Sequence, residues 1–102
     1  MKLYCKNFID DRDGVHGIAV IFDNYEAYLH HHPIEERYDI LYGDAKMHLS
    51  GETFHVSAGE TIWIPASAVH NIKPISKYII MRYYFPKGPF KDIKYKWLPS
   101  RL

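Results

Sequence analysis

The chain has 102 residues, which is enough for a single domain around one hydrophobic core. Hydrophobic residues make up 47% and charged residues 25%, as in an ordinary globular protein, and no apolar run is long enough to span a bilayer. The formal net charge of +1 gives no overall field that would attract nucleic acid or a membrane surface. The single cysteine, Cys5, excludes an intrachain disulfide, and the first residues lack an apolar signal region, so we expect a cytoplasmic protein.

The first part of the chain has the pattern of short strands separated by turns. Residues 2–9 alternate loosely before an acidic turn, and residues 15–22 form an apolar run of strand length. The turn signal Asp23-Asn24 precedes a third strand candidate at 25–32. A fourth candidate, at 38–42, is rich in residues that favour strands. We therefore expect strands, and no helix, in this part of the chain.

The second part of the chain continues the same pattern. Residues 45–49 and 53–56 flank a Ser-Gly-Glu turn as a hairpin, and further strand candidates lie at 61–64, in a short segment that ends at Pro74, and at 78–85. No segment of helical length has a 3.6-residue period. Many short strands with turns at this spacing predict an all-β sandwich or barrel, with residues 1–102 in one domain.

Alternation along the hairpin predicts which of its side chains face the core. The inward face is assigned to four apolar residues: Met47, Leu49, Phe54 and Val56. His48 and His55 fall on the other face. Together with His16 they have no partner at the spacing of metal ligands, so we expect all three histidines to be exposed or half-exposed.

The strongest chemical signal begins at the end of the third strand candidate. His30 and His32 are two residues apart, so on a strand their side chains leave from the same face. Pro33 ends that strand and Glu36 begins the next run, so two imidazoles and a carboxylate converge where adjacent strands meet. His70, after a short turn, could supply a third imidazole. Three neutral nitrogens and one carboxylate are a ligand set for a first-row transition metal.

The spacing of these residues resembles the two sequence motifs of the cupin family. His30-x-His32, three residues, Glu36, six residues and Gly43 resemble the first motif, at about 24–43. Gly59, five residues, Pro65 and then His70 resemble the second motif, at about 59–74. The fifteen residues from 44 to 58 between the two motifs are typical of small cupins. The resemblance implies a double-stranded β-helix, the jelly-roll barrel of RmlC-like proteins.

The sequence departs from the cupin pattern at three turn positions. Asn24 stands where the first motif usually opens with Gly, and Asn still tolerates a turn conformation. Ser67 replaces the Gly of the usual Pro-x-Gly, and Pro74 takes the place of the final Asn of the second motif. None of the three is a ligand position, so the departures bear on the subfamily more than on metal binding.

The resemblance implies one divalent transition metal, Fe, Mn, Ni or Zn, bound by His30, His32, Glu36 and His70 inside one end of the barrel. Four protein donors leave about two open positions on an octahedral ion, where a substrate and a second small ligand can bind side by side. The alternative is a barrel that has lost its metal, in which the same four residues are satisfied polar groups.

Tyr38 lies two residues beyond Glu36 and therefore on the same face, one step further into the barrel. We identify it as a candidate catalytic acid or base, and the alternative is a core tyrosine whose phenol still needs a hydrogen-bond partner. Tyr28 shares the face of the two histidines, whereas His31 should point away from the site. Two further candidates for the cavity lining, Trp63 and Arg82, can equally pack in the core or on the surface.

Positive charge is concentrated near the end of the chain. Residues 73–102 carry eight Lys or Arg against one acidic residue, whereas residues 1–72 carry five against eleven. The basic segment is expected to lie against an acidic part of the protein or of a partner subunit, or else to be a solvated tail.

The last part of this segment is a C-terminal arm at about 86–102. It should pack on the barrel or on a neighbour rather than on nucleic acid, with four possible anchors: Phe90, Tyr95, Trp97 and Leu98. A homodimer is expected because the first and last strands leave open sheet edges.

Three classes of function follow from these observations. The first is a small metalloenzyme acting on a small metabolite, and the resemblance offers dioxygenases, lyases, decarboxylases and sugar isomerases, among which the fold does not choose. The second is a non-catalytic module that binds a small molecule, and the third is a storage or structural subunit, which the intact ligand set argues against. A tyrosine at position 38 also resembles small cupins that cleave dimethylsulfoniopropionate, although cupins of other activities carry an aromatic residue there.

Overall fold

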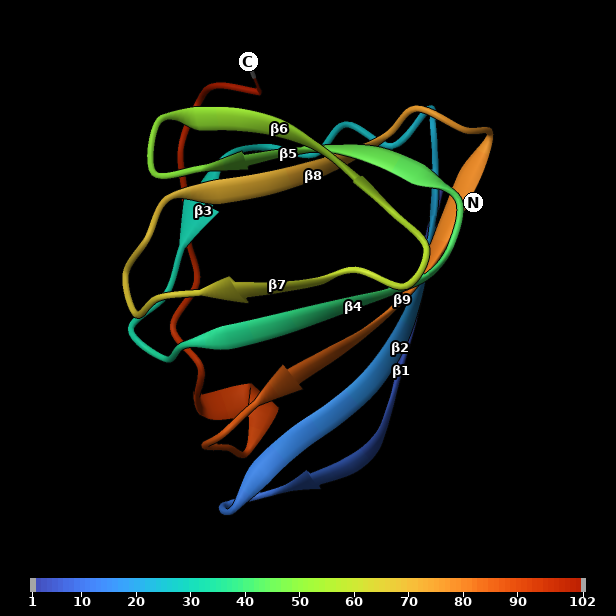
Figure 1. The fold of residues 1–102 in the computed structure, drawn as a ribbon. Coiled ribbons are helices and arrows are strands. Elements are labelled where there is room, and N and C mark those ends of the chain that lie inside the picture. The colour runs from blue at the N-terminus through green and yellow to red at the C-terminus, as the bar shows by residue number, and fades with distance from the viewer. Residues whose placement is uncertain (1, 102) are drawn as a thin grey trace.

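A computed structural model describes residues 2–101, which form a barrel of two five-stranded sheets (Figure 1). The strands are β1 (Leu3–Asp11), β2 (Gly14–Phe22), β3 (His30–His31), β4 (Glu36–Tyr42), β5 (Asp44–Leu49), β6 (Glu52–Ser57), β7 (Thr61–Ile64), β8 (His70–Pro74), β9 (Tyr78–Phe85) and β10 (Lys96–Trp97), with a single 3₁₀ turn, η1 (Phe90–Asp92), before β10. The predicted all-β class is therefore confirmed. No helix in the described range is long and apolar enough to cross a membrane.

The two sheets bring together strands that are far apart in the sequence. One sheet has the order β1-β2-β9-β4-β7 and the other has the order β10-β3-β8-β5-β6, with antiparallel pairing throughout. The chain passes back and forth between the sheets, as Figure 1 shows for β4, β5 and β7. This is the topology of a double-stranded β-helix, as the sequence motifs imply.

The core lies between the inner faces of the two sheets, and strand alternation selects its residues. In β9, Ile79, Met81, Tyr83 and Phe85 are buried. Arg82, between two of them, is exposed because successive side chains on a strand point to opposite faces. Fully burying an aliphatic or aromatic side chain of this size stabilises the fold by about 1.5–3 kcal/mol. The inner face of β9 thus contributes both to the core and, through Met81 and Tyr83, to a cavity described below.

Turn positions of the two motifs adopt the left-handed backbone conformation. Gly43 and Gly59 have φ angles of 90° and 94°, and a Cβ on Gly43 would lie 2.7 Å from the carbonyl oxygen of Tyr78. Ser67, which replaces a motif glycine, has a φ of 64°. Its amide donates a 2.8 Å hydrogen bond to the carbonyl of His32, which ties the turn before His70 to the first motif. Ser67 therefore keeps the backbone shape of the glycine that it replaces.

The strand expected at 25–32 is shorter in the structure. Only His30 and His31 pair as a strand, and the preceding segment is irregular. The Leu29 amide donates to the carbonyl of Ser100 at 2.8 Å, and the Leu29 carbonyl accepts from the Leu98 amide at 2.9 Å. The partner of this segment is thus the C-terminal arm, which cannot be recognised from local pattern.

One predicted exposure in the hairpin, that of His48, is wrong. Phe54 lies opposite the buried Met47 and so on the predicted inward face, although it is 37% exposed because β6 is an edge strand. His48, expected on the surface, is 6% exposed and lies between its cross-strand partners Thr53 on β6 and Asn71 on β8. Its Nδ1 lies 2.6 Å from the Thr53 hydroxyl, and burial together with Lys46 and Lys73 lowers the pKa of His48.

Candidate metal centre

Three histidines from two neighbouring segments converge at one end of the barrel. His30 is the first residue of β3, His32 follows that strand, and His70 begins β8 directly opposite His30. One ring nitrogen from each of the three lies within 4.8 Å of the others, so the histidines are positioned to hold a metal ion. His32 and His70 are 1% and 0% exposed, whereas His30 is half-buried.

Each imidazole is oriented by a hydrogen bond from its own Nδ1 to the main chain. The Nδ1 atoms of His30, His32 and His70 lie 3.1, 2.7 and 2.8 Å from the carbonyl oxygens of Tyr28, Ile34 and Ala68. A carbonyl only accepts, so in a neutral ring Nδ1 carries the proton and Nε2 keeps its lone pair. This is the arrangement by which metal-binding histidines are usually held.

Glu36, the first residue of β4, completes the cluster. One of its carboxylate oxygens lies 3.1 Å from Nε2 of His32 and 3.5 Å from Nε2 of His70, and its side chain is almost fully buried. Neighbouring ligands on an octahedral ion with bonds of about 2.1 Å lie roughly 3 Å apart, so these separations match an ion between the groups.

The donor set fits a cation better than it fits a set of mutually satisfied polar groups. With the protons on Nδ1, no hydrogen is available between the Nε2 atoms and the Glu36 carboxylate. Nε2 of His70 is buried and has no hydrogen-bond partner within residues 2–101. A buried polar atom without a partner is costly, and an ion bound between Nε2 of His70 and the Glu36 carboxylate would satisfy it.

His30 is in the protonation state that metal binding requires. Burial lowers the pKa of His30 to about 4, and the neighbouring His70 adds to this shift. His30 is therefore neutral at pH 7, and a neutral imidazole can offer its Nε2 lone pair to an ion.

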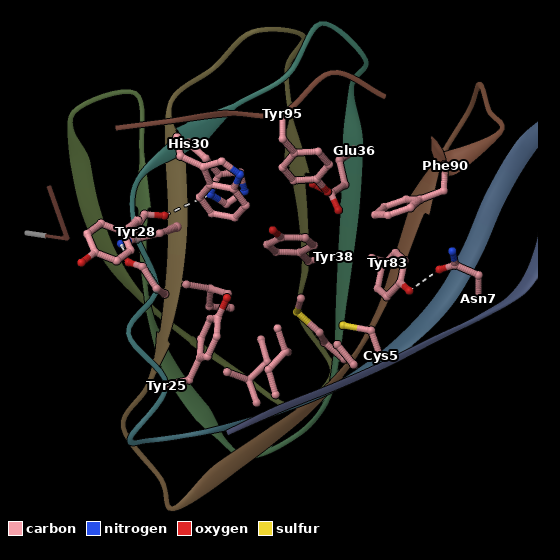
Figure 2. Close-up of a pocket in the computed structure, with 18 residues that line it drawn as sticks. Cys5, Asn7, Tyr25, Tyr28, His30, Glu36, Tyr38, Tyr83, Phe90 and Tyr95 are labelled. Carbon is pink, nitrogen blue, oxygen red and sulfur yellow. Dashed lines mark hydrogen bonds between the residues drawn. The ribbon is translucent and has the colours of Figure 1, made fainter. Parts of the chain in front are cut away.

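A cavity of about 470 Å³ opens beside the cluster and extends into the barrel (Figure 2). His30 and Glu36 reach its wall, and most of the remaining lining is apolar or aromatic. Within residues 2–101, no lysine or arginine is among the residues that line it. Five tyrosines contribute to the wall: Tyr25, Tyr28, Tyr38, Tyr83 and Tyr95.

Tyr38 lies on the same inward face of β4 as Glu36, as the alternation of side chains along the strand predicts. It is 5% exposed, it lines the cavity, and its ring centroid is 6.2 Å from that of His70. Figure 2 shows its hydroxyl directed into the cavity, and within residues 2–101 that hydroxyl makes no hydrogen bond. Burial, and secondarily the Glu36 carboxylate, raise the pKa of Tyr38 well above its usual value. Tyr38 is therefore a neutral phenol at pH 7, and a positive ion nearby, which would lower its pKa, would have to overcome both effects.

The other sequence candidates lie at the margin of the cavity or outside it. Tyr28 is 39% exposed, and the Arg101 guanidinium lies 5.3 Å from its ring centre. Trp63 is 54% exposed on the outer face, where it pairs with Arg37, the outward neighbour of Glu36. Arg82 is also on the outer face, between the inward Met81 and Tyr83. Neither Trp63 nor Arg82 contributes to the lining of this cavity.

Part of the cavity wall comes from the C-terminal arm and was not assigned to the site from the sequence. Phe90, Tyr95 and Trp97 line the cavity, and the His30 ring centroid lies 5.4 Å from that of Tyr95 and 4.6 Å from that of Trp97. The sequence signal for these residues was limited to their aromatic character, which marked them as anchors. Their place beside a ligand depends on where the arm folds back.

Known structures with the same fold are cupins, as the motifs implied. A RmlC-like cupin from Shewanella frigidimarina superposes with a TM-score of 0.80 at 15% identity, covering 87% of this chain and 79% of its own. An uncharacterised double-stranded β-helix protein from Klebsiella pneumoniae gives a TM-score of 0.82 at 17% identity, covering 97% and 86%. The chain therefore has the cupin fold.

A DMSP lyase, DddQ from Ruegeria pomeroyi DSS-3, is also similar, with a TM-score of 0.81 at 16% identity over 94% of this chain. The chain spans about half of the DMSP lyases that it matches, 51% in this case. No protein-family model matches the sequence, and a search of curated proteins finds no significant relative. The similarity to known proteins thus extends to the fold, and the site must be interpreted from its own geometry.

Proposed function

We propose that this protein is a metal-dependent enzyme that acts on a small organic substrate held in the cavity, with His30, His32, Glu36 and His70 as ligands of one divalent transition metal. The observation that carries the proposal is the convergence of Nε2 lone pairs and a buried carboxylate at the wall of a cavity large enough for a small metabolite. A bound ion would act there as a Lewis acid toward an oxygen of the substrate.

The lining of the cavity limits the kind of substrate that fits. Because no lysine or arginine lines it, a carboxylate or other anionic group would find its countercharge only at the metal centre. The rest of the substrate would contact aromatic rings and aliphatic side chains such as Ile21 and Met81. This favours a small molecule with one metal-binding polar end and a body that is apolar or positively charged, because aromatic faces attract cations.

The chain's own residues favour chemistry that moves a proton. Tyr38 presents a hydroxyl to the cavity close to the ligands, with no protein partner in the described range. A positioned phenol can donate or accept a proton at a substrate atom held beside the metal centre. Among the reaction types open to a cupin, lyase- and isomerase-type reactions need such a group. The structural similarity to DMSP lyases adds dimethylsulfoniopropionate to the substrates that should be tested.

A substrate panel with defined metal content tests the proposal. The purified protein is loaded with Fe²⁺, Mn²⁺, Ni²⁺ or Zn²⁺ and incubated with dimethylsulfoniopropionate, gentisate, small hydroxy acids and sugars, and loss of substrate is followed by proton NMR. We expect turnover of at least one compound only with metal, and its loss in Glu36→Gln. A protein that binds the metal and a panel compound, yet converts none, would instead be a non-catalytic binding module.

A further inference from the structure

The C-terminal arm, residues 86–101, runs beside the segment that carries His30. β10 pairs with β3, so that Trp97 lies opposite His30 and Lys96 opposite His31. On its other side, β3 is joined to β8 by the single pair His30 and His70. A two-residue strand with so little support on one side depends on the arm for its position.

Two aromatic rings of the arm lie against the His30 imidazole. Tyr95 stacks on it with a centroid distance of 5.4 Å and an interplanar angle of 21°, and the Trp97 ring is 4.6 Å away. The two arm residues also stack on each other at 5.6 Å and 22°. His30 is thus in contact with an aromatic pair supplied entirely by the arm.

The other two histidines are more deeply buried. The Tyr95 ring also lies 4.9 Å from that of His32, but His32 and His70 are only 1% and 0% exposed. His30 is only half-buried, and its one side-chain hydrogen bond, to the Tyr28 carbonyl, is the longest of the three such bonds at 3.1 Å. Rotation of the ring about its χ angles is therefore least restricted at His30.

We propose that Tyr95 and Trp97 are positioning residues for His30: their stacked rings hold the imidazole with Nε2 turned toward the metal centre. The inference rests on the proposed metal site and extends it. In this view the arm is required to position a metal ligand and does more than line the cavity. Removing the Trp97 ring should leave the barrel folded, since Trp97 is 57% exposed and contributes little to the core, whereas Tyr95 packs against the core.

Two measurements on the full chain test this inference. In protein labelled with nitrogen-15 histidine, long-range proton–nitrogen NMR spectra report the tautomer and the exchange broadening of each imidazole. In Trp97→Ala we expect the His30 signals to lose the single Nδ1-protonated pattern, while those of His32 and His70 remain. The affinity for Zn²⁺, measured by competition with a chelating dye, should fall by about 10- to 100-fold, as for other groups that orient a metal ligand.

Matched variants separate positioning from general destabilisation. Trp97→Phe keeps a ring against His30 and should restore the wild-type NMR pattern and affinity, and Tyr95→Phe should do the same. Trp63→Ala removes a tryptophan of similar exposure, 54%, on the outer face of the other sheet and should change neither measurement.

Three results would decide against the inference or against the metal site. The inference is overturned if Trp97→Ala has the same His30 signals and the same Zn²⁺ affinity as the wild-type protein. It is also overturned if Trp63→Ala loses as much Zn²⁺ affinity as Trp97→Ala does. If the wild-type protein binds no Zn²⁺, the proposed metal site is wrong, and the NMR comparison still decides whether the arm holds His30.

Discussion

His30 and His70 lie opposite each other as the only residue pair between β3 and β8 in the described chain, with ring centroids 4.3 Å apart. Forty residues separate them in the sequence, and the two sequence motifs meet at this pair. Each ring is turned by its own Nδ1 hydrogen bond to a carbonyl two residues earlier, from Tyr28 and from Ala68. The local backbone therefore gives both rings the same Nδ1-bonded orientation, more weakly at His30 than at His70, and the pairing of β3 with β8 sets the distance between them.

Metal content is the most direct prediction. We expect one divalent ion per chain in the wild-type protein, and none in the double variant His32→Ala, His70→Ala, because the remaining imidazole and carboxylate cannot enclose an ion. Elemental analysis of protein purified without added metal measures both. A matched double variant of surface histidines, His31→Ala with His55→Ala, should keep the metal. Full occupancy in the first variant would show that these histidines are not ligands.

Removing only the hydroxyl of Tyr38 tests its role in the chemistry. Tyr38→Phe should keep the fold and the metal content, and it should lower kcat by about 10²- to 10⁴-fold, the usual contribution of a positioned acid or base. Steady-state kinetics on the substrate found in the panel measure the effect. Tyr25→Phe, at another tyrosine of the cavity wall, is the control. Full activity of Tyr38→Phe would show that Tyr38 is a core residue and takes no part in the chemistry.

The buried tyrosines predict a loss of stability at alkaline pH. Burial raises the pKa of Tyr83 to about 12, from 10 in an exposed tyrosine. The folded state thus holds this proton more tightly than the unfolded state does, so the contribution is fully present below pH 10 and is lost as the pH rises through about 12. Between these values the free energy of unfolding of the wild-type protein should fall more steeply than that of Tyr83→Phe. The free energies of unfolding are measured by urea denaturation at several pH values across this range. If they fall equally with pH in the wild-type protein and in Tyr83→Phe, Tyr83 is not the group responsible.

Gly17 is required because the Tyr83 ring lies over it. A Cβ at position 17 would come within 2.2 Å of that ring. Gly17→Ala should therefore displace Tyr83, break its hydrogen bond to Asn7, and reduce the free energy of unfolding by about 1–3 kcal/mol, as overpacking usually does. Chemical denaturation measures the loss. The double variant Gly17→Ala, Tyr83→Ala should recover part of it, and no change in the single variant would mean that the ring moves freely.

A homodimer remains the prediction for the assembly. β1 is an edge strand whose residues Tyr4, Phe8 and Ile9 are 51%, 55% and 46% exposed, and a partner subunit would cover them. Light scattering at micromolar concentration should give the dimer mass, and Phe8→Glu should shift it toward the monomer. A monomer mass for the wild-type protein, unchanged by concentration, would count against pairing through this edge.

The sequence by itself determined the features that depend on neighbouring residues. Spacing of two residues placed His30 with His32, and Glu36 with Tyr38, on common faces, and turn residues such as Gly43 marked the strand ends. These features follow from the two-residue period of a strand and the few backbone conformations open to a turn. They were sufficient to predict an all-β sandwich or barrel, and the resemblance to the two cupin motifs added the double-stranded β-helix and the four candidate ligands.

Only the tertiary structure decided the features that depend on distant segments. His48 is buried although alternation along β5 places it on the same face as the exposed Lys46, and the outward direction of Trp63 and Arg82 follows from the pairing of their strands. The clearest case is the arm, whose aromatic residues are adjacent to His30 only because β10 pairs with β3. That pairing joins residues more than sixty positions apart, and no local pattern contains it.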